Sequence, residues 1–173
     1  MIKYLYCFLF SVFLVFIAQS ITSLKYINNL NLILVALVFI TIVWGFNLGF
    51  IFAIFMGFLL NLYSYLPLGT FIVIYLIIIG LVNFLYKHIL INFSFVTNLI
   101  LIVLASILYG LLLALFNYLF FLIGFVKIYI LMDGLVINKL LWQVVFNAIL
   151  TSVIFIIARI FYKRLNSVFL IKK

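Results

Sequence analysis

The 173-residue chain contains one acidic residue, one histidine and one cysteine, namely Asp133, His88 and Cys7. General acid–base catalysis usually needs at least two positioned titratable groups, and a structural metal site needs about four ligands. A disulfide within the chain would need a second cysteine. The composition therefore predicts a protein that is not an enzyme and that holds neither a metal ion nor another cofactor.

Each of these three residues also has a simple structural interpretation. His88 follows Lys87 and is expected to be a solvated loop residue. Asp133 is expected to pair with Lys127 or Lys139 at the membrane interface, or to remain open to a partner. Cys7 lies inside an apolar run and is expected to face lipid or to pack between helices.

The rest of the sequence is mainly apolar. They make up 72% of the chain, and charged residues make up 6%, against about 25% in a typical soluble domain. Because a helix needs about 20 apolar residues to cross a bilayer, this length permits about five or six crossings. We expect an all-α integral membrane protein with a single polytopic domain over residues 1–173.

The apolar segments and their connections predict six transmembrane helices in one bundle. The second and third are short for full crossings, and Gly45 between them leaves room only for a tight turn or a broken helix. Pro67 is expected in the first turn of the fourth helix. The first could be a signal peptide with cleavage near Ala18 and Ser20, but its long apolar core favours an uncleaved helix. The six segments are Ile2–Ile21, Leu32–Trp44, Gly45–Leu62, Leu68–Tyr86, Asn98–Gly124 and Lys139–Tyr162.

The net charge of +9 is explained better by the membrane than by nucleic acid, because the basic residues are scattered except near the C-terminus. Six crossings place both termini on one side of the membrane. Three basic residues fall on the opposite side: Lys25, Lys127 and Lys139. Seven fall on the terminal side: Lys3, Lys87, Arg159, Lys163, Arg164, Lys172 and Lys173. This asymmetry predicts a multi-pass membrane protein with both termini in the cytoplasm, contacting anionic lipid and no nucleic acid.

The third segment carries a stripe of small residues at four-residue spacing, which lets another helix approach closely in lipid. Packing within the bundle is favoured over direct contact with a partner protein. The fifth segment repeats the pattern with Ser106, Gly110 and Ala114, so the third and fifth helices are expected to pack together. The stripe consists of Gly45, Gly49, Ala53, Gly57 and Asn61, and Gly69 follows it in the next connection.

A polar stripe runs along the sixth segment, through Gln143, Asn147, Thr151 and Arg159. Polar side chains in hydrocarbon turn towards the protein and find hydrogen-bond partners there. We expect this stripe to face the bundle interior, with Arg159 close enough to the helix end to reach the interface. As a substrate site it lacks convergent charged groups.

One region resembles a known family. The runs Gly45-Phe46-Asn47-Leu48-Gly49, Gly57-Phe58-Leu59-Leu60-Asn61-Leu62-Tyr63-Ser64 and Leu66-Pro67-Leu68-Gly69 are similar to the central signature of the rod shape-determining protein MreD family. That signature reads approximately G-x-x-x-G, then G-L-L-x-D, then P-L-G. Gln19 and the run Phe146-Asn147-Ala148-Ile149-Leu150 through Arg159 also resemble the family's first and final helices. Asn61 departs from the pattern, because the family usually has Asp there.

The resemblance implies a non-enzymatic membrane scaffold of the bacterial cell-elongation machinery. Such proteins associate with MreC, and through it with MreB filaments and with the RodA and class B penicillin-binding protein pair that builds lateral peptidoglycan. The implied fold is similar to the six-helix substrate-binding subunits of energy-coupling-factor vitamin transporters, which supply the alternative function. Many of those subunits carry an Ala-x-x-x-Ala motif in the first helix, where this chain has only Ala18.

Overall fold

The computed structural model describes residue 13 and residues 30–89, 94–126 and 134–169, without the side chains of residues 135 and 158–169. Within these ranges the chain is helical, with no strand, which confirms the expected all-α class. The first predicted crossing, Ile2–Ile21, lies outside the described residues apart from residue 13, and so do Cys7, Lys127 and Asp133. The helices are α2 (Leu32–Trp44), α3 (Phe46–Leu62), α4 (Thr70–His88), α5 (Phe95–Ile123) and α6 (Gly134–Phe169).

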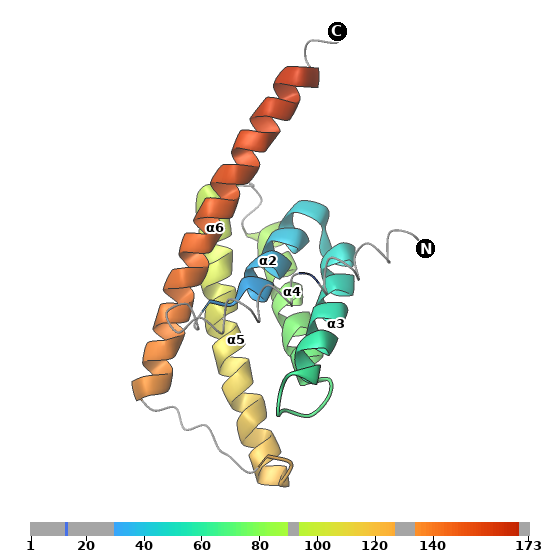
Figure 1. Ribbon diagram of the computed structural model, residues 1–173, viewed down its shortest axis with the longest axis vertical. Helices are drawn as coiled ribbons and strands as arrows, with labels where there is room; N and C mark the ends of the chain where they lie inside the picture. The colour runs from blue at the N-terminus through green and yellow to red at the C-terminus, as the bar shows by residue number, and fades with distance from the viewer. Residues whose placement is uncertain (1–12, 14–29, 90–93, 127–133, 170–173) are drawn as a thin grey trace.

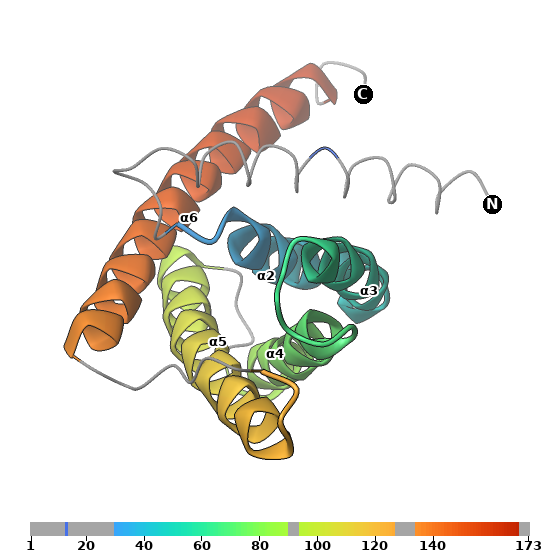
Figure 2. The same ribbon diagram turned by 60° about the horizontal axis from the view of Figure 1, so that its bottom comes forward.

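The short helix α2 is the centre of the bundle (Figures 1 and 2). It contacts all four other described helices, and eight of its 13 residues are buried. Around it, α3 packs on α4, α4 on α5, and α5 on α6. A 13-residue helix is about 20 Å long, short of the roughly 30 Å hydrocarbon thickness, so α2 does not cross a bilayer by itself.

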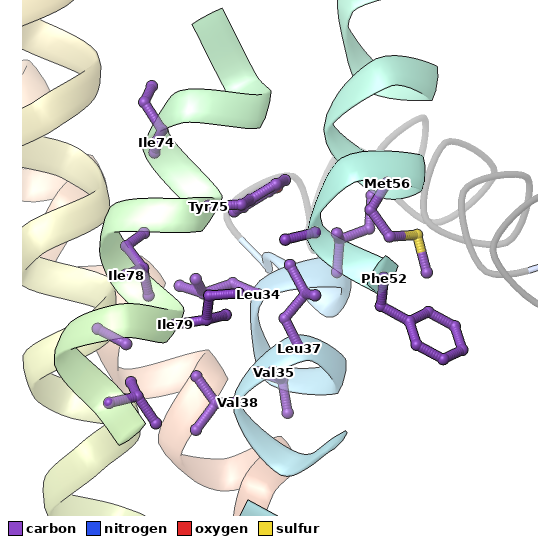
Figure 3. Close-up of a cluster of buried hydrophobic side chains, with 14 of the residues drawn as sticks. Leu34, Val35, Leu37, Val38, Phe52, Met56, Ile74, Tyr75, Ile78 and Ile79 are labelled. Atoms are coloured by element: carbon purple, nitrogen blue, oxygen red, sulfur yellow. The ribbon is translucent and has the colours of Figure 1, made fainter. Parts of the chain in front are cut away.

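The hydrophobic core lies mainly between α2, α3 and α4 (Figure 3). Leu34 and Leu37 of α2 belong to the same buried cluster as Ile74, Ile78 and Ile79 of α4, all with 0% exposure. Because lipid is as apolar as these side chains, their contribution comes from close packing rather than from escape from water. The isoleucine and leucine side chains therefore fix how α2 sits against α4.

The outer surface of the bundle is also apolar. Large exposed side chains occur along the outward faces of the helices, for example Phe50, Phe58, Leu104, Leu111, Ile149 and Val153. Three helical stretches are long and apolar enough to span a membrane: Thr70–His88, Phe95–Ile123 and Val136–Ile157. This combination indicates a membrane protein whose outer surface is suited to lipid.

Two expected boundaries in the α3–α4 hairpin are wrong by a few residues. Pro67 does not lie in the first turn of α4; its carbonyl oxygen instead accepts the Thr70 N–H at 3.2 Å and closes a turn before the helix. Gly69 has φ +97°, which suits the third position of a type II turn and prevents an earlier helix start. His88 was expected in a loop, but it lies in the last turn of α4, exposed, with its ring 4.8 Å from that of Phe84.

The two long helices begin earlier than the sequence indicated. Helix α5 starts at Phe95 because the Ser94 hydroxyl accepts the Thr97 N–H at 3.1 Å, a hydrogen bond typical of an N-cap. Helix α6 starts at Gly134, so Val136 to Asn138 are helical rather than part of the expected loop. Both helices are consequently longer than a perpendicular crossing requires.

Helices α2 and α3 form a hairpin joined by one non-helical residue, Gly45 (Figure 1). Its φ of +90° is a conformation that residues with a side chain rarely adopt. The expected tight connection at Gly45 is therefore observed, and the direction of the chain reverses within a single residue.

Candidate functional site

The small-residue stripe of α3 packs against helices of the same chain. A Cβ atom on Gly49 would meet the Oγ1 of Thr41 in α2 and lie 3.1 Å from its Cβ. A Cβ on Gly57 would lie 2.7 Å from both the Cα and the backbone nitrogen of Ile72 in α4. Ala53, between these two glycines, has 0% exposure. The stripe thus supports internal packing on both sides of α3, as the sequence favoured.

Asn61, the last member of the stripe, holds the start of α4. Its side chain is buried, and its Oδ1 accepts the Phe71 N–H at 3.4 Å. The N-cap residue of α4 is Gly69, which has no side chain to supply such a bond, so Asn61 partly substitutes for a capping side chain. The Asn61 Nδ2 has no hydrogen-bond partner within the described part of the chain.

The α3–α4 hairpin therefore joins several predicted site residues into one structure. Gly57 allows the backbones to approach, Asn61 binds the first turn of α4, and Gly69 shapes the turn between the helices. Thr70 adds a hydrogen bond from its Oγ1 to the Pro67 carbonyl oxygen at 2.7 Å. These contacts are structural, and none of them leaves a reactive group open to a substrate.

The small residues of α5 face α6, and the expectation that they pack against α3 is wrong. A Cβ on Gly110 would meet the Leu140 side chain of α6, and Ser106 accepts a hydrogen bond from Asn147 of α6. No contact joins α3 to α5 among the described residues. The physical reason is that α2 and α4 lie between them, since both helices contact α5 and α3.

Asn147 is the centre of a polar junction between three helices. Its Nδ2 donates to the Ser106 Oγ of α5 at 2.9 Å, and its Oδ1 accepts the Asn31 N–H at 3.0 Å. Asn31 is the N-cap of α2, where its own Oδ1 accepts the Leu34 N–H at 3.0 Å. The expectation that Asn147 faces the interior is confirmed by its exposure of 0%.

The junction lies deep in the bundle. Asn147 is at the centre of the apolar stretch Val136–Ile157, and Ser106 is near the middle of α5. Because Asn31 contacts Asn147 directly, α2 begins level with the middle of these two helices, and Figure 2 shows its start beside α6. Asn31 falls in the connection expected between the first and second crossings, yet it is half-buried and lies against α6.

The other members of the α6 stripe make fewer hydrogen bonds to neighbouring helices. Thr151 is buried, and its Oγ1 donates to the Asn147 carbonyl oxygen at 2.8 Å, a bond within its own helix. Gln143 is half-buried and makes no side-chain hydrogen bond to another described residue. The side chain of Arg159 is outside the described part. The stripe thus supplies one cross-helix contact residue rather than a convergent site.

Sequence reasoning missed the buried Tyr75 and the half-buried Asn31, which contacts α6. Asn31 carried a usable signal, because an asparagine directly before an apolar helix is typical of an N-cap. Tyr75 carried none, since one tyrosine among 11 in an apolar chain does not stand out.

The Gly57 contact yields a prediction. Gly57→Ala should destabilise the protein by about 1–3 kcal/mol, because the added methyl group meets the α4 backbone, which cannot move aside as a side chain can. Gly80→Ala is the matched control: that position is also in a helix but has nothing within 4 Å, so the change should stabilise by up to about 1 kcal/mol. Thermal unfolding in detergent micelles measures both, and equal effects would contradict the close approach at Gly57.

The polar junction yields a second prediction. Asn147→Ala should cost about 1–2 kcal/mol, because it removes both side-chain bonds and leaves the Asn31 N–H unpaired in the interior. Gln143→Ala, one helical turn away, should change the free energy of unfolding by less than about 0.5 kcal/mol. Titration with a denaturing detergent compares the two variants, and a larger loss at Gln143 would refute this assignment.

No protein-family model matches the chain, and no curated protein or solved structure shows significant similarity to it. The side chains of Asn31, Asn61 and Asn147 bind helix ends or neighbouring helices. In such a packed membrane bundle, these interior polar contacts hold the helices of the chain together.

Proposed function

We propose that the protein is a non-enzymatic scaffold subunit of the bacterial cell-elongation machinery, of the MreD type. In this proposal it binds an MreC-like protein, and through it acts with MreB and with the RodA and class B penicillin-binding protein pair. The supporting observation is that four of the residues which carry the family resemblance act together in the α3–α4 hairpin. Gly57, Asn61, Pro67 and Gly69 each have a specific structural task there.

That observation supports the proposal because it explains why such residues would recur at these spacings. Replacing the glycine at the α3–α4 contact or the turn glycine would disturb the hairpin, so their spacing reflects a constraint beyond an apolar composition. At position 61, an asparagine oxygen accepts the Phe71 N–H as a carboxylate oxygen would. The structural task at that position is therefore compatible with the Asp that the family usually has.

The alternative is a substrate-binding membrane subunit of an energy-coupling-factor-type vitamin transporter. Such a function calls for several polar groups that converge on an outward pocket. Here the interior polar groups of Asn31, Ser106 and Asn147 bind one another. This favours the scaffold over the transporter subunit.

Partner recovery and cell shape test the function together. A tagged chain, extracted from host membranes in mild detergent, should recover the MreC-like protein, and its depletion should turn rod-shaped cells round. As a control, Gly80→Ala should keep both activities, because that position touches nothing within 4 Å. Recovery of an energy-coupling transporter subunit with unchanged cell shape would instead establish the alternative.

The proposed localisation is the bacterial plasma membrane, with six crossings and both termini in the cytoplasm. Figure 1 shows the end of α4 and the C-terminal end of α6 at one end of the bundle, and the start of α6 at the other. The exposed residues Lys87 and Lys139 therefore lie at opposite ends. This agrees with the sides to which the charge pattern assigns them.

Cysteine labelling tests this topology. In a Cys7→Ser background, Lys87→Cys should react with a membrane-impermeant maleimide only after the cells are opened, whereas Lys139→Cys should react in intact cells. The expected difference follows from the excess of basic residues on the cytoplasmic side. Labelling of Lys87→Cys in intact cells would overturn the proposed orientation.

A further inference from the structure

Tyr75 combines complete burial with a hydroxyl group that has no hydrogen-bond partner among the described residues. The residue extends from α4 into the hydrophobic core (Figure 3). Its ring stacks on that of Tyr109 in α5, with ring centroids 6.0 Å apart and an interplanar angle of 16°. An unpaired hydroxyl in such a place destabilises the folded state, because it loses its hydrogen bonds to water and gains none in return.

The hydroxyl is close to the half-buried start of α2. Asn31 and Tyr109 approach it closely enough to interact, but no hydrogen bond of good geometry joins the Tyr75 hydroxyl to either side chain. Asn31 in turn caps α2 and binds Asn147, which binds Ser106. Polar groups from α2, α4, α5 and α6 therefore gather around one point near the middle of the bundle.

The chemistry of this point determines which ligand suits it. Every described polar group there is an amide, a hydroxyl or a backbone group, so the described residues supply no opposite charge to compensate an ion in a low-dielectric interior. A neutral ligand with both donors and acceptors fits best. Buried waters commonly bind buried polar groups that lack other partners, with about three hydrogen bonds each.

We propose that this junction binds a structural water molecule, which accepts the hydrogen bond of the Tyr75 hydroxyl and bridges it to Asn31 and Tyr109. The water completes the polar contacts around the start of α2 and connects that helix to α4, which the direct hydrogen bonds at Asn147 do not reach. The proposal rests on the fold and is independent of the proposed function.

Radiolytic labelling of the intact protein in a lipid nanodisc tests the site directly, since ionising radiation generates hydroxyl radicals from bound water next to buried side chains. Tyr75 should be modified several-fold faster than Phe52, a similarly buried aromatic residue of α3 with 3% exposure. Equal, background-level modification of Tyr75 and Phe52 would overturn the proposal.

Replacement of the hydroxyl gives a second readout whose sign distinguishes a water-bound group from an unpaired one. If water binds Tyr75, Tyr75→Phe removes a hydrogen bond from the site and should lower the Tm by a few degrees. If the hydroxyl is dry and unpaired, the same change should leave the Tm unchanged or raise it, and either result would overturn the proposal. Tyr63→Phe, at an exposed position, is the control and should leave the Tm unchanged.

Discussion

The structure depends on the hydrogen bonds that the backbone at the start of α2 finds inside an apolar bundle. A helix N-terminus has N–H groups without intrahelical partners, and hydrocarbon supplies none. Asn31 binds one of these groups within α2, and Asn147 of α6 binds the N–H of Asn31 itself. These two amides allow a 13-residue helix to start against α6, and its side chains then form much of the core.

Close backbone approach is the second constraint, and it complements the first. Without a hydrophobic drive between helices in lipid, van der Waals contact must hold them together, and that contact requires small residues at the crossing points. Gly49 allows α3 to reach α2, Gly57 allows it to reach α4, and Gly110 allows α5 to reach α6. The central helix is therefore fixed by polar contacts at its start and by steric fit along α3.

Composition and periodicity were sufficient to predict the helical class and the bounds of α2 and α3 to within one residue, because Gly45 interrupts an otherwise continuous apolar run. They also predicted that Asn147 faces inward. The helix that each contact face meets could not be predicted. Small residues at four-residue spacing mark a contact face but carry no information on which helix packs there. Ser106 and Gly110 were therefore expected to contact α3, whereas they contact α6. The depth of Asn31 was missed because a cap residue is polar whether it is at the surface or in the interior.

The contact between Asn31 and Asn147 spans 116 residues of the chain, and this has a consequence for biosynthesis. A ribosome makes the chain from the N-terminus, so the core helix α2 enters the membrane well before α6 exists. Until α6 is made, the start of α2 lacks the amide that binds Asn31. The helices made earlier therefore form only a part of the bundle, without this hydrogen bond. The last helix to be made therefore completes the centre of the fold, and a polypeptide that stops before Asn147 would have an unfinished interior rather than a shorter version of the same bundle.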